Sequence, residues 1–165
     1  MRAIVGLDPS MHNTGYAVFD CYHGLCEHGV LTVNNSYTGV ECVLRMIRKA
    51  KDFLEAVESS YGKYELAVEV QKYHPTLEKM GINSLMNLQA ACVGCAVVSE
   101  YPDLVYPYEP VQWKGTINKD IHNRRMLNKF NLAESTAHDA LDAIGIADYH
   151  IRKKYGKKKE GPNKA

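Results

Sequence analysis

Four carboxylates stand at places in the sequence where side chains can do chemistry. Asp8 ends the apolar stretch "AIVGL" and precedes Pro9, and Glu69 interrupts the apolar stretch in "LAVEVQ". Asp139 and Asp142 are three residues apart in "STAHDALDAIGIA", so they share one face if this stretch is helical. Each strand acid also has an ordinary interpretation, Asp8 as a turn former before proline and Glu69 as an exposed edge-strand acid. The choice depends on whether the fold brings the four together.

A gathering of these acids indicates metal chemistry. Two unit charges about 4 Å apart repel by roughly 4 kcal/mol at an effective dielectric near 20, which forces one carboxylate to take a proton unless a cation intervenes. Oxygen ligands favour Mg²⁺ or Mn²⁺ over zinc. Four carboxylates suffice for two such ions about 3.5 to 4 Å apart. We therefore expect a site with two hard divalent cations, held by Asp8, Glu69, Asp139 and Asp142.

The elements that would position these acids follow from hydrophobic periodicity. Apolar runs predict three strands joined by short connections, hence an antiparallel meander, and two later strands that return through helices and lie parallel. Thr38 with Glu41 suits a capping box, and Asn118 and Ser135 suit helix N-caps. The fold class predicted is α/β, one mixed five-stranded sheet whose first three strands are antiparallel, flanked by helices. The expected strands are 2–7, 15–20, 25–33, 65–70 and 103–108, and the expected helices are 38–57, 84–100, 118–130 and 135–155.

Length and charge set the domain organisation. The 165 residues, 45% of them hydrophobic, suit one globular domain over 1–155. Residues 1–110 carry 8 Lys and Arg against 13 Asp and Glu, whereas 111–165 carry 12 against 6, so the last third is basic. The segment 156–165 is expected to be a disordered basic tail. It is either a solubilising tail or an arm that binds polyanions.

The sequence also restricts the cellular setting. No apolar run approaches the roughly 18 residues of a membrane span, so we expect no membrane partner. The N-terminus lacks a basic segment followed by an apolar one, the layout of a signal peptide. The 5 cysteines are odd in number and lie among apolar neighbours, which fits a reducing compartment. We therefore expect a cytoplasmic protein.

Three motifs in this order, "GLDPSMHNTGYAVF", "AVEVQKY" and "AHDALDAIGIA", resemble the RuvC-type Holliday-junction resolvases of the RNase H-like superfamily, in particular its small phage or mobile-element branch. The resemblance covers nearly all of residues 3–151. It implies an RNase H-like fold and assigns the catalytic and metal-binding roles to Asp8, Glu69, Asp139 and Asp142. His138 is either a further candidate beside the metal site or an ordinary histidine on the helix surface.

The resemblance implies a Mg²⁺- or Mn²⁺-dependent endonuclease that resolves four-way DNA junctions by symmetric paired nicks, without a covalent enzyme intermediate. Paired nicks need two sites, hence a two-fold homodimer, in the cytoplasm of a bacterial host if the protein is phage-encoded. The helix around Ala90, Ala91 and Gly94 either contributes to that interface or packs within one subunit. The first motif also resembles, faintly, the phosphate loop of actin-like ATPases, but the chain is too short for their second domain. We expect no nucleotide cofactor.

The expected partner is branched double-stranded DNA. Tyr73 is a candidate for stacking at the junction centre, and Trp113 is expected to be buried. Other nucleic-acid functions remain open at this point: a nuclease of forks, flaps or RNA–DNA hybrids, or a non-catalytic nucleic-acid-binding protein. The residues expected to contact DNA are Lys72, Tyr73, Lys114, Lys119, Arg124 and Arg125.

Overall fold

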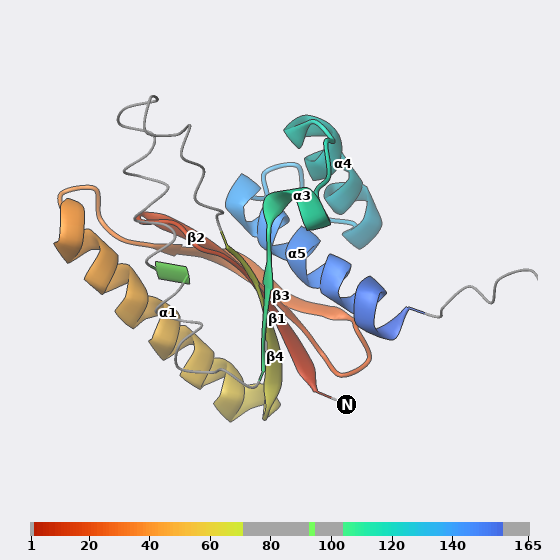
Figure 1. The fold of residues 1–165 in the computed structure, drawn as a ribbon, viewed down its shortest axis with the longest axis horizontal. Coiled ribbons are helices and arrows are strands. Elements are labelled where there is room, and N and C mark those ends of the chain that lie inside the picture. Colours follow the sequence, from red (N-terminus) through yellow and green to blue (C-terminus); the bar gives the residue numbers. More distant parts are fainter. Residues whose placement is uncertain (1, 71–92, 95–103, 157–165) are drawn as a thin grey trace, which may run out of the picture.

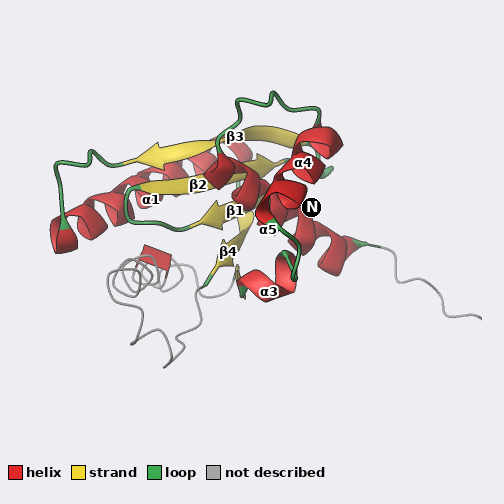
Figure 2. Ribbon diagram, turned by 90° about the horizontal axis from the view of Figure 1, so that it is seen from above, coloured by secondary structure: helices red, strands yellow, loops and turns green. Residues whose placement is uncertain are grey.

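The computed structural model describes residues 2–70, 93–94 and 104–156. Its strands are β1 (Ala3–Asp8), β2 (Asn13–Phe19), β3 (Leu25–Thr32), β4 (Tyr64–Glu69) and β5 (Val105–Tyr108). They form one five-stranded sheet in the order β3-β2-β1-β4-β5, and β3, β2, β1 and β4 follow one another across the sheet in Figure 2.

The pairing of the strands confirms the predicted topology. β1, β2 and β3 pair antiparallel, in a meander whose second turn has His23 at a positive φ of 68°. β4 pairs parallel with β1, and β5 pairs parallel with β4. A parallel neighbour needs a crossover connection, and α1 (Gly39–Tyr61) lies between β3 and β4 in the chain. The sheet is therefore mixed, with β5 at one edge.

Helices cover both faces of the sheet. α1 lies along one face, and α5 (His138–Tyr155) crosses the other, with α4 (Lys119–Phe130) and the short α3 (Pro110–Trp113) beside it (Figure 1). Each face has its own hydrophobic core: Ala50 and Leu54 of α1 pack against one side, Leu141 and Ile144 of α5 against the other. The result is three layers, helix, sheet and helix.

The alternation of side chains along the strands decides which face the strand acids take. In β1, Val5 and Leu7 belong to the core under α1, whereas Ile4 belongs to the core under α5. Successive side chains of a strand point to opposite faces, so Asp8 shares the α5 face with Ile4. By the same alternation Glu69 lies on the α5 face of β4, because Val68 packs toward α1. Both strand acids therefore face the helix that carries the other two.

Two predicted helix starts are corrected. The last helix was expected to begin with Ser135 as its cap, but it begins at His138 with Ala137 at the N-cap position and no side-chain cap. The Thr136 hydroxyl and backbone N–H both donate to the Ala133 carbonyl, at 2.7 and 2.9 Å, so this segment turns before the helix starts. The predicted end at Tyr155 is confirmed.

At the first helix, Thr38 is the N-cap residue, but its side chain makes no cap hydrogen bond, so the capping box predicted with Glu41 is not formed. Glu41 instead accepts from the Arg45 guanidinium at 2.9 Å. The cap predicted at Asn118 is confirmed, because its side chain accepts from the backbone N–H of Asp120. The one-turn helix α3 was not predicted.

Several expectations fall outside the described residues: Lys72, Tyr73, the rest of the loop 71–83, most of the predicted helix 84–100 and all but Gly156 of the basic tail. Within the described part of the chain, no helix combines the length and the apolar character of a membrane span.

Candidate active site

Asp8 and Glu69 lie side by side at one edge of the sheet. Each is the last residue of its strand, and the parallel register of β1 and β4 places Leu7 opposite Val68, one residue before the acids. Parallel strands bring their carboxyl ends to the same edge, which is where open α/β sheets place their ligands. Both acids are partly buried.

A glycine allows α5 to bring its acids to this edge. Gly15 of β2 pairs with Asp8 across the sheet. A Cβ atom at Gly15 would collide with the backbone carbonyl of Asp139. The first turn of α5 can therefore touch β2 only because residue 15 has no side chain. Asp139 thus sits beside Asp8, and Asp142 follows three residues later, on the same side of the helix.

The four acids act on one another electrostatically. The pKa of Asp8 is raised well above its ordinary value, first by burial and then by the negative charges of Glu69, Asp142 and Asp139, against a small opposing effect of Lys119. Burial also raises the pKa of Asp139, against the opposing charge of Lys119 and with a smaller contribution from Asp142. The four predicted acids therefore lie within electrostatic range of one another, in a negatively charged region at the end of β1 and β4 and the start of α5.

Two lysines partly balance Asp142, which is only 7% exposed. Lys114 Nζ lies 3.2 Å from Asp142 Oδ1, and Lys119 Nζ lies 3.6 Å from Oδ2. Both lysines were expected to contact DNA, and the structure places them at the acids themselves. The buried His122 is a third neighbour, its Nε2 lying 3.7 Å from Asp142 Oδ1. Burial lowers the pKa of His122, so its ring is neutral at pH 7.

Trp113 holds Glu69. Its indole Nε1 donates a hydrogen bond to Glu69 Oε2 at 2.9 Å. Gly145 of α5 makes room for this ring, because a Cβ there would lie 3.0 Å from Trp113 Cζ3. The predicted burial of Trp113 is confirmed, since its side chain is 7% exposed, whereas its hydrogen bond to Glu69 was not predicted. Trp113 and Glu69 are 44 positions apart in the sequence, and a local sequence pattern cannot predict a hydrogen bond over that separation.

His138, the first residue of α5, has a buried partner of its own. The Asn123 amide of α4 donates to His138 Nδ1 at 2.7 Å, which fixes the ring orientation next to Asp139. Arg124 and Arg125, also on α4, are exposed. The basic residues predicted at this helix therefore divide into lysines at the acids and arginines at the surface.

The donor set fits hard cations. All four acids offer oxygen, the ligand type of Mg²⁺ and Mn²⁺. Burial and the charges of Glu69, Asp142 and Asp139 raise the pKa of Asp8, and Lys119 acts in the opposite direction. Among the described residues, no three His, Cys, Asp or Glu side chains stand close enough together to hold a metal ion. The acids lie within electrostatic range of one another, and Asp142 forms ion pairs with Lys114 and Lys119.

Comparison with known proteins identifies the fold. No protein-family model and no curated protein sequence matches the chain. Among solved structures, it is similar to Thermus thermophilus RuvC in complex with a Holliday junction substrate, with a TM-score of 0.67 and 20% identity over 92% of this chain and 93% of that one. A second Thermus thermophilus RuvC structure gives a TM-score of 0.63 and 22% identity over 93% and 96%. The chain therefore has the RNase H-like fold of the RuvC structures, over nearly its whole length.

Proposed function

We propose that this protein is a metal-dependent endonuclease that cleaves four-way DNA junctions by symmetric paired nicks. The observation that supports the proposal is that Asp8 lies within electrostatic range of Glu69, Asp139 and Asp142, so that burial and these three negative charges raise its pKa. These negatively charged residues belong to a fold that is similar to that of a RuvC protein solved in complex with a Holliday junction substrate. An acid cluster of this kind is unfavourable in a protein unless a cation completes it.

The four acids would hold two Mg²⁺ or Mn²⁺ ions, which when bound activate water for in-line attack and stabilise the leaving 3′-oxygen. Trp113 keeps Glu69 in place through its 2.9 Å hydrogen bond. Lys114 and Lys119, which stand at Asp142, supply positive charge where a phosphodiester must approach the acids. With the 3′-oxygen as the leaving group, the P–O3′ bond breaks, so the products would carry 5′-phosphate and 3′-hydroxyl ends, and no side chain needs to form a covalent bond with DNA.

Paired nicks at a two-fold symmetric junction require two such sites, so we propose a homodimer. The chain offers one set of four acids, and a second copy supplies the second set. DNA as the substrate also favours the cytoplasm as the place of action, that of a bacterial host if the protein is phage-encoded.

The test is cleavage of a mobile four-way junction, with each strand labelled in turn, in Mg²⁺ and in Mn²⁺. We expect nicks at symmetric positions in two opposite strands, 5′-phosphate ends, and complete loss on chelation. Asp142→Asn should abolish cleavage, whereas Asp52→Asn, which neutralises an exposed carboxylate on α1, should leave it unchanged.

Parallel assays on forks, flaps, linear duplex and RNA–DNA hybrids distinguish the junction from other substrates. Preferential cleavage of any of these would replace the substrate in the proposal. Tight junction binding without cleavage by a folded protein in either metal would indicate a non-catalytic binding protein.

A further inference from the structure

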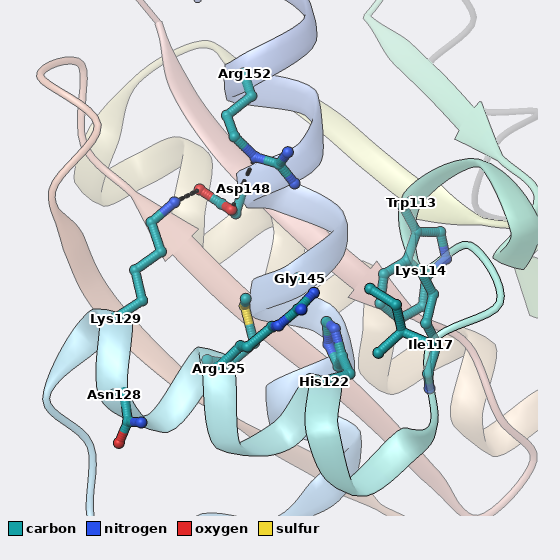
Figure 3. Close-up of a pocket in the computed structure, with 11 residues that line it drawn as sticks. Trp113, Lys114, Ile117, His122, Arg125, Asn128, Lys129, Gly145, Asp148 and Arg152 are labelled. Carbon is teal, nitrogen blue, oxygen red and sulfur yellow. Dashed lines mark hydrogen bonds and ion pairs between the residues drawn. The ribbon is translucent and has the colours of Figure 1, made fainter.

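We propose that the cleft between α4 and α5 is a phosphate-binding site, separate from the four acids, and, resting on the proposed function, that its phosphate belongs to the DNA backbone. The cleft has a volume of about 660 Å³ and is lined by cations from both helices, Arg125 and Lys129 of α4 and Arg152 of α5 (Figure 3). None of these three contacts the acids described above.

A buried carboxylate positions two of the cations. Asp148 of α5 is only 5% exposed. Its Oδ1 lies 2.6 Å from Lys129 Nζ, and its Oδ2 accepts from Arg152 Nε at 3.1 Å. Both oxygens are thus engaged, one by each helix, and Figure 3 shows the two cations converging on Asp148. Long basic side chains lose conformational entropy when they bind a ligand. Because Asp148 already holds Lys129 and Arg152 in place, less entropy is lost when a ligand binds them.

Arg125 completes the site. It lies one turn before Lys129 on α4, so the two share a face of the helix. Figure 3 shows its side chain extending across the cleft toward Gly145 of α5. Among the described carboxylates, none forms an ion pair with Arg125. Within the described part of the chain, no carboxylate competes with a ligand for its guanidinium, whose planar fork of donors matches the oxygens of a phosphate.

The charge balance of the cleft favours an anion. Arg125, Lys129 and Arg152 contribute three positive charges, and Asp148 contributes one negative charge, which leaves an excess of two. The net charge of the cleft is therefore positive, whereas the region around Asp139 and Asp142, nearer the start of the same helix, is negative. A second metal site is thereby disfavoured in the cleft, and a phosphate group suits it.

Lys114 connects the cleft with the acids. It lines the cleft and also lies 3.2 Å from Asp142 Oδ1. A nucleic-acid strand bound at the acids can therefore pass Lys114 and continue over the cleft, where Arg125 and Lys129 would hold a phosphate away from the scissile one. Trp113, the only tryptophan of the chain, lines the same cleft and reports on its occupancy.

The experiment follows Trp113 fluorescence of the full chain without divalent metal, so that binding is read apart from cleavage. The probes are inorganic phosphate, a short linear duplex and a four-way junction. We expect each to change the emission, and phosphate to compete with DNA. Arg125→Ala with Lys129→Ala should weaken DNA binding roughly tenfold and lower the slope of log affinity against log salt by about one unit or more. Arg48→Ala on α1, across the sheet, should leave both values unchanged.

An unaltered salt slope and affinity in the Arg125→Ala, Lys129→Ala variant would overturn the proposal, provided that its melting curve matches that of the parent protein. A fluorescence change with phosphate that DNA does not compete away would support the phosphate site and overturn its assignment to DNA. Because no metal is present, the outcome is independent of the nuclease assay: a protein that cleaves junctions but fails here refutes only the cleft, and the reverse result refutes only the nuclease.

Discussion

β4 carries two glutamates, Glu65 and Glu69, whose surroundings are opposite in charge. They are four residues apart in one strand, so both face α5. Glu65 lies near the start of β4 among hydrogen-bond donors from the last two turns of α5. Glu69 lies at the other end, among the acids of β1 and of the first turns of α5. The same residue type on the same face therefore serves two different purposes.

Glu65 is fully compensated. It accepts hydrogen bonds from His150 Nε2, Lys154 Nζ and the Tyr155 hydroxyl, each at 2.8 Å. Burial alone would raise the pKa of Glu65, but these bonds outweigh it and lower the pKa. Because the carboxylate can only accept, His150 Nε2 carries the proton, and its Nδ1 accepts from the Tyr108 hydroxyl at 2.7 Å. The network joins β4, β5 and α5.

Glu69 accepts a hydrogen bond from the neutral indole of Trp113, and its charge adds to the effect of burial in raising the pKa of Asp8. Satisfied buried charges stabilise one arrangement, whereas an unbalanced set is unfavourable until something positive binds. The two glutamates therefore differ in surroundings although they share a residue type: Glu65 belongs to a hydrogen-bonded network, and Glu69 lies among the acids of the proposed active site.

Glu69→Gln should give the largest effect. The change keeps the shape of the side chain and removes one negative charge from the acid cluster. We expect the junction cleavage rate to fall roughly a thousand-fold, since charge stabilisation by bound metal is worth several kcal/mol. The folded structure should persist. Cleavage under single-turnover conditions measures the effect, and a rate within tenfold of the parent protein would contradict it.

The matched control is Glu65→Gln, the same substitution four residues earlier in the same strand. Corrected for the folded fraction, its cleavage rate should equal that of the parent protein. Equal losses of cleavage in both variants would remove the proposed distinction between the two ends of β4.

Glu65→Gln should instead lower the free energy of unfolding by about 2 kcal/mol, because hydrogen bonds to a charged group are worth roughly 1.5 to 3 kcal/mol and a neutral amide replaces the carboxylate. Urea denaturation measures it as a lower midpoint with an unchanged slope. Glu55→Gln on the exposed side of α1 should change stability by less than about 0.5 kcal/mol. Equal stability of the two variants would argue against a structural role for Glu65.

Trp113→Phe should have a smaller effect on cleavage. It keeps an aromatic ring beside Gly145 and removes the N–H group that donates to Glu69. We expect the cleavage rate to fall roughly tenfold, the equivalent of one lost hydrogen bond to a charged acceptor. A rate equal to that of the parent protein would show that Glu69 needs no fixed orientation.

Local sequence patterns predicted the acids around Glu69 but not the hydrogen-bonded network around Glu65. Asp8 and Glu69 stand at the ends of apolar runs, and Asp139 and Asp142 share a helical face, so periodicity was enough to find them. The strand order was predictable for a related reason, because short connections indicate antiparallel pairs and helical ones indicate parallel pairs.

The partners of the acids could not be found in this way. Glu65 and His150 are 85 residues apart, and Lys129 and Asp148 are 19 apart on two helices. Such pairs depend on how helices pack against the sheet, which hydrophobic periodicity leaves undetermined. The start of α5 was missed because the bond of Thr136 to Ala133 competes with the cap predicted at Ser135.

The smallest effect is a difference in pH dependence between the two ends, measured without divalent metal. The pKa of Asp8 is raised by folding above its ordinary value of 3.8, so between these two values the folded chain holds a proton that the unfolded chain has released. The contribution of Asp8 to stability is therefore lost as the pH rises through this window. Glu65, whose pKa is lowered from 4.5, behaves oppositely: its contribution is present above its ordinary value and is lost as the pH falls through the lowered one.

Asp8→Asn should accordingly be more stable than the parent protein at pH 7 and lose the part of the pH slope that arises from Asp8. Urea midpoints collected from pH 4 to pH 8 measure both. Asp52→Asn, at an exposed position of α1, controls for the loss of one negative charge. Added Mg²⁺ should reduce the advantage of Asp8→Asn, because a cation bound among the acids stabilises only the chain that keeps them. An Asp8→Asn variant less stable than the parent at pH 7 would mean that the acid end is already balanced, and the contrast with Glu65 would disappear.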